Sequence, residues 1–255
     1  MNTWRIAQAR SLGTSHIADN IPCQDYHLAD CIDDGAATYL LIAVADGAGS
    51  AARSGDGAKK ACDAAMLHLK EHAAELAAPA NAREVVTEAF SAALRAIIEF
   101  GECEAIEIRQ LASTLLVAVV ASDFTVFGQV GDGAFVCDVD DKLNVPYWPD
   151  QIALNLTDFI TSAPLEQILH VQVVPRKIMR LACMTDGLAP LLLDFRTKSP
   201  HVPIFERLFS TCQAAPDPSD LDEDLEVFIS SAAVNERTDD DKTLILAIRQ
   251  EQGLA

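Results

Sequence analysis

Three apolar segments of this chain each run directly into an Asp-Gly pair, and this pattern constrains the fold more than any other feature. A strand end holds a carboxylate on a rigid element, and the glycine allows a sharp turn and a close approach by another group. One Asp-Gly after a strand is usually only a turn, but several at the ends of core strands predict convergence on one site. The pairs are Asp46-Gly47, Asp132-Gly133 and Asp186-Gly187, and the run Asp239-Asp240-Asp241 adds a fourth carboxylate group before the last apolar segment.

Carboxylates that converge repel one another unless they are protonated or bridged by cations. Ligands made only of oxygen select hard ions such as Mg²⁺ or Mn²⁺ over zinc or copper. The six histidines form no HExxH-type pair, and the sequence has no GxSxG, no GxxxxGK[ST] and no GxGxxG motif. The residues therefore indicate a Mg²⁺ or Mn²⁺ site rather than a serine-hydrolase or nucleotide-binding site.

Length and composition fit a soluble domain. Half of the 255 residues are apolar, which is enough for one sizeable core, so we expect residues 1–255 to form a single domain. No signal-peptide pattern opens the chain and no apolar run approaches the ~20 residues of a membrane span, so we expect a cytoplasmic protein without membrane contact. The seven cysteines show no CxxC spacing, which argues against a disulfide framework or a structural zinc site.

The charge is strongly acidic, with 38 acidic against 19 basic residues and a formal net charge of −19. This balance argues against nucleic-acid binding through phosphate neutralisation. It also disfavours any phosphorylated substrate, unless bound divalent cations reverse the field locally.

The order of predicted elements favours an α+β fold. Strands in adjacent runs separated by helices predict mainly antiparallel sheet with helices packed outside. Asn81, with Glu84 three residues later, has the pattern of a capping box that starts a helix. Strands are expected over 39–45, 111–121, 124–130, 134–139, 171–174, 178–184 and 243–248, and helices over 54–76, from 81 to about 100, 205–212 and 221–232.

Taken in order, these motifs resemble those of the protein phosphatase 2C family of metal-dependent serine/threonine protein phosphatases, in its bacterial form. The match spans about Gly13 to Ile248, and although each motif alone is weak, their joint order and spacing are specific. The matching segments are Gly13-Thr14-Ser15-His16 with Asn20, Pro22 and Gln24-Asp25; Val44 to Gly49; Ala112-Ser113-Thr114; Val130-Gly131-Asp132; Met184 to Leu188; and Asp240-Asp241-Lys242-Thr243.

The resemblance implies a central antiparallel β-sandwich flanked by α-helices on both outer faces, a four-layer αββα arrangement. It also implies a centre of two Mn²⁺ or Mg²⁺ ions at one end of the sandwich. Asp46 would bridge both ions, the Gly47 carbonyl oxygen would bind one, and Asp186 and Asp240 would hold the other. Asp46 and Asp186 would thereby hold the water that attacks phosphorus.

Two further aspartates have implied roles at this centre. Asp25 would act through water, and Asp132, with Asp186, would correspond to a third metal position seen in bacterial members. The implied substrates are proteins that carry phosphoserine or phosphothreonine. A serine/threonine kinase or its targets are the implied partners.

Several positions depart from the family pattern. Asn20 stands where many members carry the Arg that binds the substrate phosphate, so phosphate binding would rely on the metals, on Asn20 or on another group such as Arg53. Ala48 stands where some members have a His, so water would have to protonate the leaving group. Asp241 replaces the usual Asn, so it is an alternative ligand to Asp240, which the register to Thr243 favours. Residues 145–162 would form a short flap near the site.

Two other functions stay open on the sequence. The missing Arg and His are also compatible with a catalytically weak or inactive module that binds a phosphoprotein or a kinase. A phosphatase of small phosphorylated metabolites would need a closed polar pocket. The retained aspartates favour the active protein phosphatase, because buried carboxylates are costly without cations.

Overall fold

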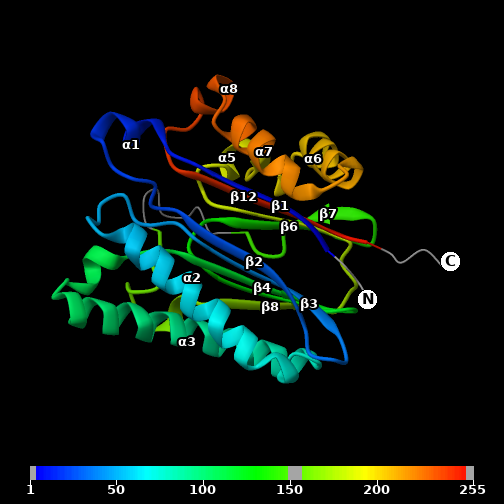
Figure 1. Cartoon of the computed structure of the whole chain (residues 1–255), viewed down its shortest axis with the longest axis horizontal. Coiled ribbons are helices and arrows are strands. Elements are labelled where there is room, and N and C mark those ends of the chain that lie inside the picture. The colour runs from blue at the N-terminus through cyan, green and yellow to red at the C-terminus, as the bar shows by residue number, and fades with distance from the viewer. Residues whose placement is uncertain (1–3, 149–156, 251–255) are drawn as a thin grey trace.

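The computed structural model describes residues 4–148 and 157–250, and at its centre two antiparallel sheets pack face to face (Figure 1). The first sheet has the strand order β1 (Trp4–Ser11), β12 (Lys242–Arg249), β9 (Arg180–Met184), β6 (Ala134–Val139) and β7 (Lys142–Asn144). The second has the order β2 (Tyr26–Asp33), β3 (Thr38–Ala45), β4 (Leu115–Val120), β5 (Thr125–Val130) and β8 (His170–Val174).

The alternation of side chains along each strand explains why the central strands are almost wholly apolar. In β3, Leu40 and Ile42 face the other sheet, whereas Leu41 and Ala43 pack toward the helices. Successive side chains of a strand point to opposite faces, so a strand covered on both faces needs apolar residues at every position. The unbroken apolar run that comes directly before Asp46 is therefore a strand buried between two layers.

Helices cover the outer face of each sheet, which gives four layers (Figure 1). The second sheet packs against α2 (Ser54–Glu71) and α3 (Pro79–Glu104), and the first against α6 (Val202–Ala214) and α7 (Asp222–Ile229). The predicted antiparallel sandwich with helices on both outer faces is confirmed. Shorter helices are α1 (Thr14–Asp19), α4 (Leu165–Ile168), α5 (Ala189–Leu192) and α8 (Ala232–Asn235).

Several predicted element bounds are wrong, and the N-terminal strands β1 and β2 were not predicted at all. The helix expected over 54–76 ends at Glu71, where a short 3-10 turn at Ala73–Glu75 follows. The next helix begins at Pro79 and not at Asn81, and no side chain caps it. Proline suits the first helical position because its missing N–H has no partner there anyway. The helix expected over 221–232 is two helices, α7 and α8.

The register brings five of the motifs to one end of the sandwich. The end of β3 lies beside the start of β2, since Ala45 pairs with Tyr26. The end of β9 lies beside the starts of β6 and β12, since Met184 pairs with both Ala134 and Leu244. Of the expected flap over 145–162, residues 149–156 lie outside the described part of the chain.

Candidate metal centre

Asp46 is held at the end of β3 by a neighbouring loop. Its backbone N–H donates to Thr114 Oγ1 at 2.9 Å, and the Thr114 N–H donates back to the Asp46 carbonyl oxygen at 2.8 Å. A Cβ on Gly47 would lie 2.9 Å from both the Gln24 carbonyl oxygen and the Ser54 Cβ, so only glycine fits beside the start of α2. The segment 112–114 thus fixes the turn that carries Asp46.

Asp186 follows β9, and its glycine neighbour makes a second close approach. A Cβ on Gly187 would lie 2.0 Å from the Asp241 carbonyl oxygen. The backbone of the last carboxylate group therefore packs directly against the Asp186-Gly187 turn, as the sequence pattern predicts for a glycine that follows a functional Asp.

Asp25 joins the two sheets at this end of the sandwich. It is 2% exposed, and its Oδ2 accepts hydrogen bonds from Thr185 Oγ1 at 2.9 Å and Thr243 Oγ1 at 2.7 Å. Thr185 comes from the end of β9 and Thr243 from β12, whereas Asp25 immediately precedes β2 in the other sheet. These hydrogen bonds connect the N-terminal motif that contains Asp25 to the two C-terminal motifs that contain Thr185 and Thr243.

Asp132 lies in the turn between β5 and β6. Gly131 before it has a φ of 107°, a left-handed conformation that glycine adopts without strain. Thr157 Oγ1 donates to Asp132 Oδ2 at 2.6 Å, which ties one end of the expected flap to this aspartate.

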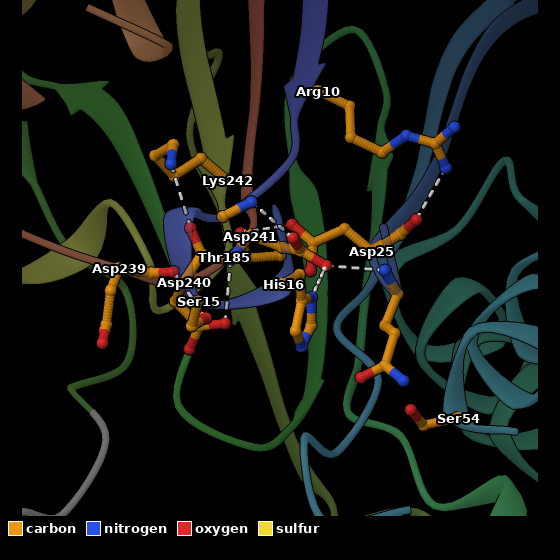
Figure 2. A network of polar contacts seen from close by, with 12 residues as sticks. Arg10, Ser15, His16, Asp25, Ser54, Thr185, Asp239, Asp240, Asp241 and Lys242 are labelled. Carbon is orange, nitrogen blue, oxygen red and sulfur yellow. Dashed lines mark hydrogen bonds and ion pairs between the residues drawn. The ribbon is translucent and has the colours of Figure 1, made fainter. Parts of the chain in front are cut away.

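The three consecutive aspartates before β12 do different things (Figure 2). The Asp239 carbonyl oxygen accepts from Ser15. Asp241 is 1% exposed, and its carboxylate accepts from the Gly13 N–H at 2.7 Å, the Gln24 N–H at 2.6 Å and His16 Nδ1 at 3.0 Å. Asp241 therefore anchors the N-terminal segment with both of its oxygens.

Asp240 lies near the other carboxylates at this end of the sandwich. It is half-buried, and one of its oxygens accepts from the Asp241 N–H at 2.8 Å. Its charge helps to raise the pKa of both Asp46 and Asp186, which places it near both. Among the three neighbours, Asp240 rather than Asp241 stays the predicted ligand.

Burial and neighbouring negative charges raise the pKa of the carboxylates at this end of the sandwich. Burial, and then the charges of Asp132 and Asp240, raise the pKa of Asp186 to about 8. Burial, and then the charges of Asp25, Asp186 and Asp240, raise the pKa of Asp46 well above its usual range. Burial raises the pKa of Asp25 to about 6, although hydrogen bonds to its carboxylate oppose that rise. Such mutual repulsion is what a bound cation relieves.

The donor set fits a hard divalent cation. Asp25, Asp132 and Asp186 each have a buried Oδ1 with no hydrogen-bond partner among the described residues. In the same residues, no three His, Cys, Asp or Glu side chains form a compact cage for one ion. The two observations are compatible, because Mg²⁺ keeps several waters and uses only one or two carboxylates of a protein.

The two predicted phosphate-binding residues lie at the surface. Asn20 ends α1 in a left-handed conformation with a φ of 57°, and its side chain is exposed. Arg53 immediately precedes α2 and pairs with Asp56. Their role in phosphate binding stays a prediction.

Comparison with known proteins leads to the same family as the sequence motifs. A family model described as Protein phosphatase 2C matches residues 12–229. The chain belongs to the protein phosphatase 2C family. A curated relative, serine/threonine-protein phosphatase 3 of Escherichia coli (strain K12), is 37% identical over 261 residues, which cover 98% of this chain and 100% of the relative.

Solved structures of other phosphatase 2C-like proteins share the fold. The catalytic domain of the serine/threonine protein phosphatase PstP, in complex with 2 manganese ions, has a TM-score of 0.61 and 14% identity, over 98% of this chain and 100% of that one. RsbX in complex with magnesium has a TM-score of 0.57 and 14% identity, over 98% and 100% of the two chains. Within the described residues of the present chain, no helix has the length and apolar character needed to cross a bilayer.

The family and the enzyme class predicted from the sequence are confirmed by these matches. Four polar residues of the site had no role predicted from the sequence: Thr114, Thr185, Thr243 and His16. Each of them lies inside a motif that carries the family resemblance. Their position beside a predicted functional Asp was the signal that could have identified them.

Proposed function

We propose that this protein hydrolyses phosphoserine and phosphothreonine in other proteins, at a centre of two Mn²⁺ or Mg²⁺ ions between the ends of the two sheets. The observation that carries the proposal is the convergence of Asp25, Asp46, Asp186 and Asp240, from four separate motifs, at one end of the sandwich. Burial raises the pKa of all four, and the charges of Asp25, Asp186 and Asp240 add to the rise at Asp46. A fold that buries four carboxylates together without a cation would lose stability for no gain.

In this proposal Asp46, Asp186 and Asp240 hold the ions, together with the Gly47 carbonyl oxygen. Asp132 and Asp186 provide a third position. When bound, the ions supply a water that is acidic enough to act near neutral pH, and they neutralise charge on the phosphoryl oxygens.

The remaining residues of the site position these ligands. Thr114 fixes the turn that carries Asp46, and Thr185 and Thr243 orient the Asp25 carboxylate. The side chain of Ala48 has no proton to give, so protonation of the leaving group falls to water. The PstP structure contains manganese and the RsbX structure contains magnesium, and both metals suit an oxygen-only ligand set.

The substrate class comes from the curated relative, whose name specifies a serine/threonine-protein phosphatase. We infer that this chain acts on phosphoproteins in the cytoplasm, and that a serine/threonine kinase is among its functional partners.

A direct assay tests the proposal. Purified protein would be given a phosphothreonine peptide with Mn²⁺, with Mg²⁺ and with a chelator, next to the variants Asp186→Asn and Asp123→Asn. Asp123 lies exposed in the β4–β5 hairpin, which makes it a matched control. Turnover should require metal and disappear in Asp186→Asn but persist in Asp123→Asn.

Three results would overturn the proposal. Turnover in the chelator at the rate seen with Mn²⁺ would exclude a metal-dependent centre. Binding of the phosphopeptide without turnover in any metal would instead support the catalytically inactive binding module. Hydrolysis of small phosphate esters but of no phosphopeptide would favour a metabolite phosphatase.

A further inference from the structure

A cationic pocket lies beside the candidate metal centre and shares Asp25 with it. The pocket has a volume of about 360 Å³, and its lining includes Arg10, Arg53 and Lys59. Arg10 is near the end of β1, Arg53 precedes α2 and Lys59 is in the second turn of α2. Three bases from different segments thus converge on one hollow at the end of the sandwich that carries the aspartates.

The bases in the pocket lining outnumber the acids, since only Asp25 and Asp56 face Arg10, Arg53 and Lys59 there. The Asp25 carboxylate is engaged by Thr185 and Thr243, neither of which lines the pocket. Asp56 pairs with Arg53. Arg10 donates to the Asp25 carbonyl oxygen at 2.7 Å and has no carboxylate partner among the described residues (Figure 2). The lining therefore has one more base than acids, with Arg10 as the base without a carboxylate partner, on a chain whose formal net charge is −19.

The ring of Tyr26 holds two of the bases in place. Lys59 Nζ lies 4.6 Å from the ring centroid and donates to the Tyr26 hydroxyl at 3.1 Å, and the Arg10 guanidinium carbon lies 5.9 Å from the same centroid. Cations over an aromatic ring gain a modest electrostatic attraction. The two charges are thus positioned before any ligand arrives.

The ion pairs already formed here are easily exchanged. Lys59 pairs with Asp63, and both side chains are about half exposed, as are those of Arg53 and Asp56. Exposed pairs of this kind contribute little to stability. An incoming anion can therefore replace them at small cost.

We propose that this pocket binds a carboxylate side chain, Asp or Glu, that flanks the phosphorylated residue of the substrate protein. This inference rests on the proposed hydrolysis of phosphoproteins. A segment whose phosphate is at the metal centre would place its neighbouring residues within reach of the pocket, because Asp25 borders both. The pocket would also offset the repulsion between an acidic substrate and an acidic enzyme.

Three phosphothreonine peptides test the inference, identical except for Glu, Gln or Lys at the positions next to the phosphothreonine. The variants are Arg10→Gln, Lys59→Gln and the double variant, with Lys70→Gln as the control, since Lys70 is exposed on the same helix, pairs with Asp30 and lies outside the pocket. The measurements are KM and kcat for each peptide, and peptide affinity by fluorescence anisotropy.

Wild-type protein should bind the Glu peptide with a KM roughly 3- to 10-fold below that of the Gln peptide, as expected for two partly exposed charge pairs. The double variant should lose this ratio, and Lys70→Gln should keep it. Equal KM values for the Glu and Gln peptides in the wild type, or an unchanged ratio in the double variant, would overturn the assignment. A retained preference in anisotropy without hydrolysis of any peptide would support the pocket and refute the proposed hydrolysis.

Discussion

Substitution of the adjacent residues Asp240 and Asp241 should shift stability in opposite directions. The Asp241 carboxylate accepts from two backbone N–H groups and from His16, all of them buried. Its replacement by Ala leaves those donors without an acceptor, and hydrogen bonds to a charged group contribute about 1.5–3 kcal/mol each. Because such contributions are not additive, we expect Asp241→Ala to lower the free energy of unfolding by ~3–5 kcal/mol, with or without metal.

Asp240 has the reverse role when no metal is present. Its charge raises the pKa of Asp46 and Asp186, so at neutral pH it adds to the free-energy cost of either ionising these groups in the folded state or keeping them protonated. Asp240→Asn keeps the acceptor for the Asp241 N–H and removes the charge. In a chelator it should therefore raise the free energy of unfolding by about 1 kcal/mol, a value discounted for its partial exposure. With Mn²⁺ it should instead lose most of the stabilisation that the ion gives the wild type.

Urea unfolding of wild type, Asp240→Asn, Asp241→Ala and the control Asp239→Ala, each at pH 7.5 in chelator and in Mn²⁺, would measure these effects. Asp239→Ala should change little, since the substitution keeps the backbone carbonyl oxygen of Asp239 that accepts from Ser15. A loss of stability in Asp240→Asn without metal, or full metal stabilisation in that variant, would contradict the assignment of Asp240 as the ligand.

Further predictions concern pH, the close glycine contact and the threonine hydroxyls. The pKa of Asp186 is about 8 in the folded chain against an ordinary 3.8, so the folded state holds an extra proton between these values. Metal-free stability contributed by that group should thus fall as pH rises from about 4 to 8, and urea unfolding in chelator should show a flatter fall in Asp186→Asn. Gly187→Ala should destabilise the fold by about 3 kcal/mol or more, because the added Cβ would meet the Asp241 carbonyl oxygen at 2.0 Å. A melting temperature within about 2 °C of the wild type would contradict this, because such a shift corresponds to no more than about 1 kcal/mol in a chain of this size. Thr243→Val should cost about 2 kcal/mol by removing a donor to Asp25, and an unchanged midpoint in urea would show that this bond is not made.

The apolar pattern was sufficient to predict antiparallel sheet covered by helices, because the central strands carry their own signal, and the family resemblance added the two-sheet sandwich. A run such as Tyr39 to Ala45 is apolar at every position, which only a strand covered on both faces requires. The Asp-Gly pairs were equally informative, since Gly187 and Gly47 are needed where backbones from other segments come close. The carboxylates of the site could therefore be predicted without the structure.

The first two strands, β1 and β2, could not be predicted from the sequence, and the reason is physical. β1 and β2 are edge strands of their sheets, so polar residues such as Arg5, Gln8 and Asp30 interrupt the apolar pattern. The role of Asp241 was equally hidden, because its three donors lie more than 200 residues away in the chain. Contacts of that range follow from the packing of whole sheets and leave no local pattern.

The threonines beside the predicted aspartates explain how one cluster can contain carboxylates of different character. Asp25 is more buried than Asp186, yet the pKa of Asp25 rises only to about 6, whereas that of Asp186 rises to about 8. The difference arises because Thr185 and Thr243 donate to the Asp25 carboxylate and favour its charged form, whereas Asp186 faces Asp132 and Asp240. With these pKa values Asp25 is mostly ionised near pH 7, whereas Asp186 holds a proton, and the pKa of Asp46 is also raised well above its usual range. Metal binding and proton release are thus linked at Asp186 and Asp46, and the hydrogen bonds to the Asp25 carboxylate leave that aspartate outside the linkage.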